Sequence, residues 1–263
     1  MNPLDGPRLK IIRAKSEIER LAGVEDAFRQ EAQYRVVKAE FNPKSGKHVY
    51  RVRVSGPPLS DNWGIWIGEI AHNLRSALDH LVYQLALLES QPKTVAADRR
   101  LQFPIFLVGS SSNKKKITFE SRGKNMIKLL RPKHQALIER LQPYHARSGH
   151  RNEHPLHLLQ EINNADKHRL IQVVGVKVGM GPAVSHWGDH RDYPFTRSHS
   201  IILKDGAKIG EATMDVHVSA DILPLVSFWK GCESVRTRGV IFVLDRIANQ
   251  VSEIVEGFGP EFD

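Results

Sequence analysis

Hydrophobic residues recur at helical spacing over the stretch from Asp61 to Ser90. Apolar side chains come every three or four positions along it, at Ile67, Ile70, Leu74, Leu78, Leu81, Leu85 and Leu88. This spacing places them on one face of a helix, and Ser60 or Asp61 can cap the first turn with a side-chain oxygen. The pattern therefore predicts a long amphipathic helix whose apolar stripe faces the core.

Other segments carry helical or strand patterns. Helical spacing continues at 7–32, 127–144, 153–166 and 235–257. The stretch 127–144 predicts one helix or two short helices split near Pro132. Two β-rich segments flank a run of turn-forming residues at 42–47, which predicts a hairpin over 34–54. Apolar runs predict further strands at 170–178, 200–203, 212–218 and 225–229.

Two segments between residues 101 and 125 have less regular patterns. LQFPIFLV at 101–108 predicts an edge strand or an extended packed segment, because Pro104 cannot donate to a strand ladder. The polar stretch at 109–125 predicts a mobile loop.

The order of these elements is typical of an α+β protein. We expect a helical bundle core, a small antiparallel sheet packed against it, and a C-terminal helix that returns to the bundle. One composite domain over 1–263 is predicted, in which 1–167 is mainly helical apart from the hairpin at 34–54. Residues 168–230 are expected to be mainly β, and 235–257 to form the last helix.

The composition indicates the charge of the protein and the compartment in which it is expected. The formal net charge is +9 and the pI about 9.7, which favours anionic partners, nucleic acid first among them. The single Cys232 excludes an intramolecular disulfide and fits a reducing compartment. The first ten residues are polar, and no apolar run is long enough to span a bilayer. We expect a cytoplasmic protein with no membrane partner.

The polar side of the predicted 61–90 helix carries the densest set of chemically useful side chains, among them His72, Arg75, Asp79 and His80. A histidine with a near-neutral pKa can move a proton, and an arginine fork can hold a phosphate. Arg75-Ser-Ala-Leu-Asp-His80 resembles the Arg-x4–6-His motif of HEPN domains. The wider pattern HNLRSALDHLVYQLA, with FPIF and NNADKHRLI, is similar to a group of uncharacterised bacterial cytoplasmic proteins.

The resemblance to HEPN domains implies a metal-independent ribonuclease of bacterial toxin or phage-defence systems, with no cofactor. In that family the Arg and His converge in a cleft, usually across a homodimer interface, and promote attack of the RNA 2′-hydroxyl on the adjacent phosphate. Arg75 and His80 would be the catalytic pair, with His72 and Asp79 tuning the charge. The alternative is an intrahelical charge cluster of His72, Arg75 and Asp79, with His80 as a packing residue.

Basic residues elsewhere could guide RNA to such a site. Arg51 and Arg53 alternate with apolar residues in the predicted hairpin, so both should share one exposed face. Lys114, Lys115 and Lys116 lie in the predicted loop and could contact backbone phosphates. The alternative for both groups is an ordinary solvated surface.

Two further functions remain open. The first is a metal-binding bundle in which His80 meets His154, His157 and Glu161 of a facing helix, since helical bundles build metal sites from inward-facing histidines and carboxylates. The second is a non-enzymatic binding or scaffold protein. The chain has no glycine-rich phosphate loop, so nucleotide hydrolysis and dinucleotide redox chemistry are not expected.

Overall fold

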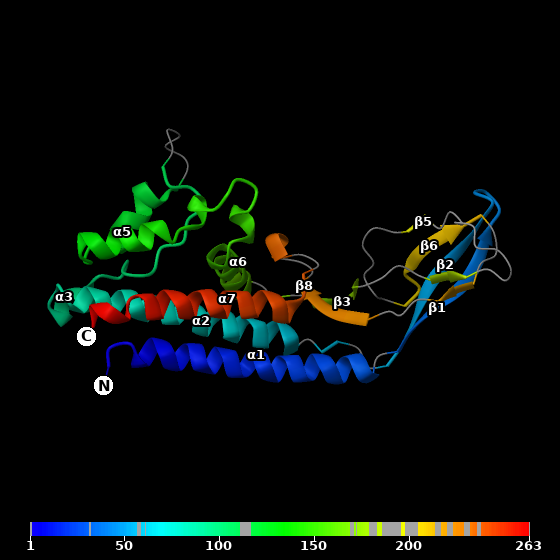
Figure 1. Cartoon of the computed structure of the whole chain (residues 1–263), viewed down its shortest axis with the longest axis horizontal. Helices are drawn as coiled ribbons and strands as arrows, with labels where there is room; N and C mark the ends of the chain where they lie inside the picture. Colours follow the sequence, from blue (N-terminus) through cyan, green and yellow to red (C-terminus); the bar gives the residue numbers. More distant parts are fainter. Residues whose placement is uncertain are drawn as a thin grey trace.

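The chain forms an α+β structure in which long helices make the core and short antiparallel sheets lie toward one end (Figure 1). This confirms the fold class expected from the order of the elements. The computed structural model describes residues 2–31, 33–56, 59–60, 62–110, 117–168, 171, 173–178, 183–185, 196–197, 205–213, 217–219, 223–228, 232–235 and 238–262.

Four helices build the core: α1 (Asp5–Glu31), α2 (Asn62–Leu87), α6 (Pro155–His168) and α7 (Val240–Gly257). In Figure 1, α1, α2 and α7 run lengthwise along the same part of the molecule, and the C-terminal helix returns to the bundle as expected. α2 and α7 each contact the other three helices, and the contacts of α2 are the more extensive, so α2 is the central helix.

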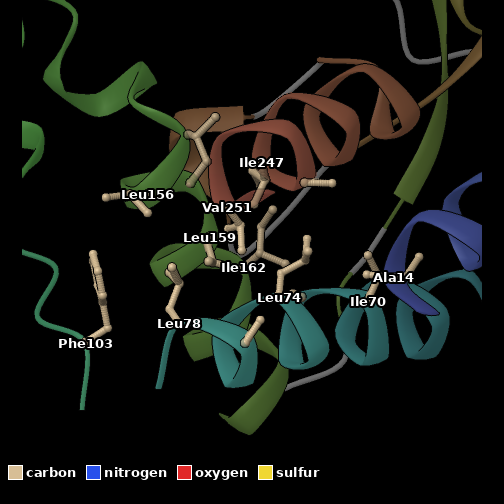
Figure 2. Packing of buried hydrophobic residues seen from close by; sticks show 14 of the residues in the cluster. Ala14, Ile70, Leu74, Leu78, Phe103, Leu156, Leu159, Ile162, Ile247 and Val251 are labelled. Carbon is tan, nitrogen blue, oxygen red and sulfur yellow. The ribbon is translucent and has the colours of Figure 1, made fainter. Parts of the chain in front are cut away.

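The predicted apolar stripe of α2 is the reason for this central position. Its members from Ile67 to Leu85 are all at most 1% exposed. Figure 2 shows Leu74 and Leu78 of α2 facing Leu159 of α6, with Val251 of α7 close by. Burial of a leucine-sized side chain stabilises a fold by about 1.5–3 kcal/mol, so this contact region dominates the packing.

Shorter helical segments surround the bundle. They are α3 (Pro92–Ala97), the π-helical turn η1 (Phe119–Gly123), α4 (Lys124–Met126), α5 (Pro132–Arg140), and the 3-10 turns η2 (Pro143–His145), η3 (Arg151–Glu153), η4 (Glu233–Val235) and η5 (Gly259–Glu261). The prediction of a loop over 109–125 is wrong for its last part, where η1 begins. The Thr118 hydroxyl accepts from the Ser121 amide at 3.0 Å, and the Thr118 amide donates to Ser121 Oγ at 2.9 Å. This reciprocal cap starts the helical turn.

The strands in the described part of the chain form three antiparallel groups. The largest sheet has the order β1 (Gln33–Asn42), β2 (Lys47–Ser55), β6 (Lys208–Ala212), β5 (Thr196–Arg197). β3 (Val173–Val178) pairs with β8 (Leu223–Phe228), and β4 (Ala183–Ser185) pairs with β7 (His217–Ser219).

The predicted hairpin is confirmed as β1 and β2, paired antiparallel. It was not expected to join the later strands, yet β2 pairs with β6, so the hairpin supplies half of the four-stranded sheet. The β3–β8 ribbon adjoins the helices, where the buried Glu25 carboxylate of α1 accepts from the Val226 amide at 2.8 Å. The strand predicted at 200–203 lies outside the described residues.

The segment at 101–108 is extended and packed, the second of its two predicted forms. Phe103 is fully buried in the core. Gln142 holds the residues that follow Phe103. Its side chain accepts from the Phe106 amide at 3.0 Å and donates to the Pro104 carbonyl at 2.8 Å. These bonds take the place of a strand ladder and fix the segment beside the end of α5.

No helix in the described ranges is long and apolar enough to cross a membrane. The single composite domain expected over 1–263 stays a prediction.

Candidate functional site

Arg75 is the buried basic residue of α2, with 8% of its surface exposed. Its Nη2 donates to Asp79 Oδ1 at 3.0 Å and to the Phe103 carbonyl at 2.6 Å. Asp79 Oδ1 also accepts from the Phe103 amide at 2.8 Å. Because Asp79 follows Arg75 by one helical turn, the ion pair is local, and the extended segment locks it in place.

The electrostatics of this pair are set by burial and by mutual attraction. Burial lowers the pKa of Arg75, and its attraction to Asp79 opposes that change. The guanidinium stays charged, because arginine is not deprotonated in proteins. Burial also raises the pKa of Asp79, against the attraction of Arg75 and the hydrogen bond from the Phe103 amide.

One donor of Arg75 is left over in this arrangement. Nη1 is buried and has no hydrogen-bond partner among the described residues. A buried donor without a partner costs about 1–3 kcal/mol, and more when the group is charged. The fold therefore leaves one strong donor of Arg75 unsatisfied among the described residues.

Arg75 lines a hollow of about 280 Å³ that is enclosed by α2, the extended segment, η1 with α4, and α6. The other lining residues are Gln102, Phe103, Ile105, Phe106, Arg122, Met126, Gln160, Asn164 and Lys167. Arg122, Asn164 and Lys167 are exposed at the rim, whereas Arg75 is buried.

The hollow is strongly cationic. Arg122 and Lys167 bring two further positive charges, and neither forms an ion pair with another described residue. None of the described lining residues is acidic. Three amide side chains add donors that can rotate to meet an oxygen. Such a set of donors suits an anion with several oxygen acceptors.

His80 lies on a different side of α2. Five residues along a helix correspond to a rotation of about 140°, so its side chain leaves the helix far from that of Arg75. It is exposed, and a Cβ atom on Gly6 would come within 3.5 Å of its Nδ1. Partial burial lowers the pKa of His80 and the charge of Lys10 lowers it further, against the attraction of Asp79. His80 is not part of the hollow that Arg75 lines.

His72 lies at a second hollow, of about 350 Å³, on the side of α2 that faces α1. The lining there is mixed in charge, with Arg13, His72 and the carboxylates of Glu17, Glu69 and Asp166. Arg13 is already paired with Glu17 at 2.9 Å. The structure thus joins Asp79 to Arg75, as the four-residue spacing predicted, but places neither His72 nor His80 beside them.

The predicted metal set of His80, His154, His157 and Glu161 is not assembled. Among the described residues, no three His, Cys, Asp or Glu side chains lie close enough to hold a metal ion. His157 Nε2 lies 3.9 Å from Glu161 Oε2 and 3.3 Å from Ser234 Oγ. The Ser234 amide also donates to Glu161 Oε1 at 3.2 Å.

The metal set does not assemble because His157 and Glu161 bond instead to Ser234, which packs η4 against α6. His154 Nδ1 accepts from the Leu156 amide at 3.3 Å, and burial lowers the pKa of both His154 and His157. His80 faces the start of α1 instead.

The basic residues predicted to guide RNA are engaged or lie outside the described part. Arg51 and Arg53 flank the buried Val52 and share one face of β2, as their alternation predicted. Arg51 donates to the Gly206 carbonyl at 2.9 Å, and Arg53 pairs with Asp205 at 3.0 Å. Lys114, Lys115 and Lys116 lie outside the described residues. An RNA-guiding role for these five stays a prediction.

Several residues of the hollow were not singled out from the sequence. Gln160, Asn164 and Lys167 follow one another at helical spacing, so the polar side of the 153–166 helix contained a signal for them. Arg122 and Gln102 lie in segments without helical periodicity, and no local pattern marks them as neighbours of Arg75.

Comparison of the chain with models of protein families, with curated proteins and with solved structures finds no match. The chemistry of the hollow therefore carries the functional conclusion.

Proposed function

We propose that the protein binds RNA and that phosphate oxygens are seated in the hollow beside Arg75. The observation that carries this proposal is the buried Arg75 Nη1, which has no partner among the described residues at a site lined by two further cations and no described acidic residue. A phosphate oxygen supplies the acceptor that this donor lacks.

Size and charge favour a single strand over a duplex. A hollow of about 280 Å³ can take one phosphate group with part of its nucleotide, but not the side of a double helix. Specific recognition of RNA commonly uses unpaired nucleotides. The net charge of +9 would draw a polyanion toward the surface before it reaches the hollow.

A binding measurement tests this proposal. Arg122→Gln and Lys167→Gln each remove one exposed cation of the rim and leave the Arg75–Asp79 pair intact. We expect each variant to bind a short labelled single-stranded RNA about tenfold more weakly in fluorescence anisotropy, the loss of one charge-assisted hydrogen bond.

Matched controls come from exposed cations that do not line the hollow. Arg147→Gln and Lys93→Gln remove the same charges elsewhere on the surface. These variants should bind as the unchanged protein does. Equal losses in all four variants would show that binding is spread over the surface, and the proposed site would be wrong.

His80 favours a second candidate function, the metal-independent ribonuclease. Its lowered pKa keeps the exposed imidazole neutral near pH 7, so it could accept the proton of an RNA 2′-hydroxyl. Because Arg75 and His80 lie on different sides of α2, their joint action would require a second copy of the chain. Cleavage of labelled RNA in excess EDTA that is lost in His80→Ala would support this function, and cleavage that persists in His80→Ala would contradict it.

A further inference from the structure

We infer that the hollow beside Arg75 selects a phosphomonoester, the terminal phosphate of an RNA end or of a free nucleotide, over an internal phosphodiester. This inference rests on the proposed function, because it names which phosphate the same site takes.

The first argument is the charge of the site. Arg75, Arg122 and Lys167 bring three positive charges, and the Asp79 carboxylate next to Arg75 offsets one of them. About two positive charges are therefore left to meet the ligand. A phosphomonoester carries about −1.5 to −2 at pH 7, whereas an internal phosphodiester carries one negative charge. The charge of the hollow matches the monoester.

The second argument is the arrangement of the donors. Arg75 comes from α2, Arg122 from η1 and Lys167 from α6, so the cations approach from three separate elements. A terminal phosphate has three free oxygens and one covalent connection. An internal phosphate has two free oxygens, and the strand must both enter and leave. A site with a buried arginine in its wall and exposed cations at its rim suits a group that enters by one end.

The third argument is the surface beside the cations. Phe106 lines the hollow, half-buried, and its ring is held by Phe119 in an edge-to-face contact with centroids 6.1 Å apart. The surface that the hollow exposes is mostly polar, although Ile105, Phe106 and Met126 border it. This lining suits the phosphate group itself, whose oxygens accept hydrogen bonds from polar side chains.

Competition binding with defined probes tests the inference. The probes are one short RNA with a 5′-phosphate, the same RNA with a 3′-phosphate, the same RNA with hydroxyls at both ends, and AMP with adenosine as its control. We expect a phosphorylated end to bind about tenfold more tightly than the hydroxyl-ended RNA, as one further charge-assisted hydrogen bond would give. This preference should vanish in Arg122→Gln and in Lys167→Gln.

The outcomes separate the inference from the proposed function. Equal binding of all RNAs with losses in the rim variants would overturn the monoester inference and leave RNA binding in place. Equal binding with no loss in the rim variants would overturn both. AMP that binds as tightly as the phosphorylated RNA, with adenosine unbound, would support the inference and identify a free nucleotide as the ligand.

A change in pH provides an independent readout. The second ionisation of a phosphomonoester has a pKa of about 6, so the ligand loses about one negative charge between pH 7.5 and pH 5.5. Affinity for the phosphorylated RNA should fall toward that of the hydroxyl-ended RNA over this interval. The hydroxyl-ended RNA serves as the control for titration of the protein. A preference that stays constant with pH would contradict selection by charge.

Asn164→Asp avoids the risk that a variant of the buried Arg75 fails to fold. It adds a carboxylate at the exposed rim with almost no change in shape, and should lower the preference for the phosphorylated end about tenfold. Asn152→Asp, exposed and outside the lining, is its matched control. An unchanged preference in Asn164→Asp would overturn the inference.

Discussion

Arg75 connects the stability of the fold with the chemistry of the hollow. One of its terminal nitrogens binds Asp79 and the Phe103 carbonyl, while the other has no partner among the described residues. The first set of bonds fixes the guanidinium, so the free donor is held in place before any ligand arrives. Pre-organisation of this kind lowers the entropic cost of binding.

Asp79→Asn tests whether the ion pair of Arg75 and Asp79 stabilises the fold. The substitution keeps an acceptor for the Phe103 amide but removes the charge opposite a buried guanidinium. Breaking a buried ion pair on one side costs about 3–5 kcal/mol. Because the Asp79 side chain is 34% exposed, we expect a smaller loss, about 2 kcal/mol in the free energy of unfolding measured with urea.

The exposed pair of Arg131 and Glu89 is the comparison. Glu89→Gln should cost less than about 1 kcal/mol, because surface ion pairs contribute little. If both substitutions had the same small effect, the Arg75–Asp79 pair would not hold the extended segment as described.

At the residue scale, the sequence predicted one half of the site. The four-residue spacing of Arg75 and Asp79 was enough to predict their ion pair. Within one chain Arg75 and His80 do not meet, because a five-residue step turns the second side chain well away from the first. Their pairing across a homodimer interface stays a prediction. The spacing of two residues along a helix gives the directions of their side chains, whereas the motif gives only which residues occur.

At the scale of elements, the site depends on segments that carry weak local patterns. The extended segment at 101–108 and the η1 turn have no periodicity, and side-chain hydrogen bonds from Gln142 and Thr118 hold them. The Gln142 bonds join residues more than thirty positions apart in the chain. The strongly periodic helices were predicted to within a few residues. The stretch 127–144 does not form one continuous helix: α4 ends at Met126 and α5 begins at Pro132, the position near which the alternative placed the split.

The contact of the turn η5 with α5, also between residues far apart in the chain, makes the stability of the fold depend on pH. Glu261 of η5 binds Lys133 and lies 2.9 Å from the buried His134 of α5. The hydrogen bond from Lys133, with that from His134, lowers the pKa of Glu261 from 4.5 to about 2. A carboxyl with a lowered folded-state pKa stabilises the fold above its unfolded pKa, and that contribution is lost as the pH falls.

Glu261→Gln should therefore lower the free energy of unfolding most above pH 5. The difference from the unchanged protein should shrink as the pH falls from 4.5 toward 2, because the unchanged protein loses the same interaction. Urea unfolding across this range measures both proteins. A difference that does not vary with pH would show that the Glu261 charge does not fasten η5 to α5.

At the scale of the whole molecule, the apolar pattern predicted the class of fold and the central helix, but not how the strands combine. β2 pairs with β6 across more than 150 residues, and a strand pattern does not name its partner. Figure 1 places the four-stranded sheet at the opposite end of the molecule from α5. The basic residues of β2 therefore lie away from the hollow, which separates these two groups of cations.

The separation of the cations of the hollow from those of β2 predicts how RNA binding responds to salt concentration. For a single strand, the slope of log affinity against log salt concentration is about −0.7 for each phosphate neutralised. The hollow has about two positive charges left after Asp79 offsets one, so binding through it should give a slope of about −1.4. Removing one rim cation, in Arg122→Gln or Lys167→Gln, should reduce the slope by about 0.7. Arg53→Gln, at the far sheet and already paired with Asp205, should leave the slope unchanged. A much steeper slope that falls equally in Arg53→Gln would mean that the net charge of the surface holds the RNA. In that case the hollow would contribute little to affinity.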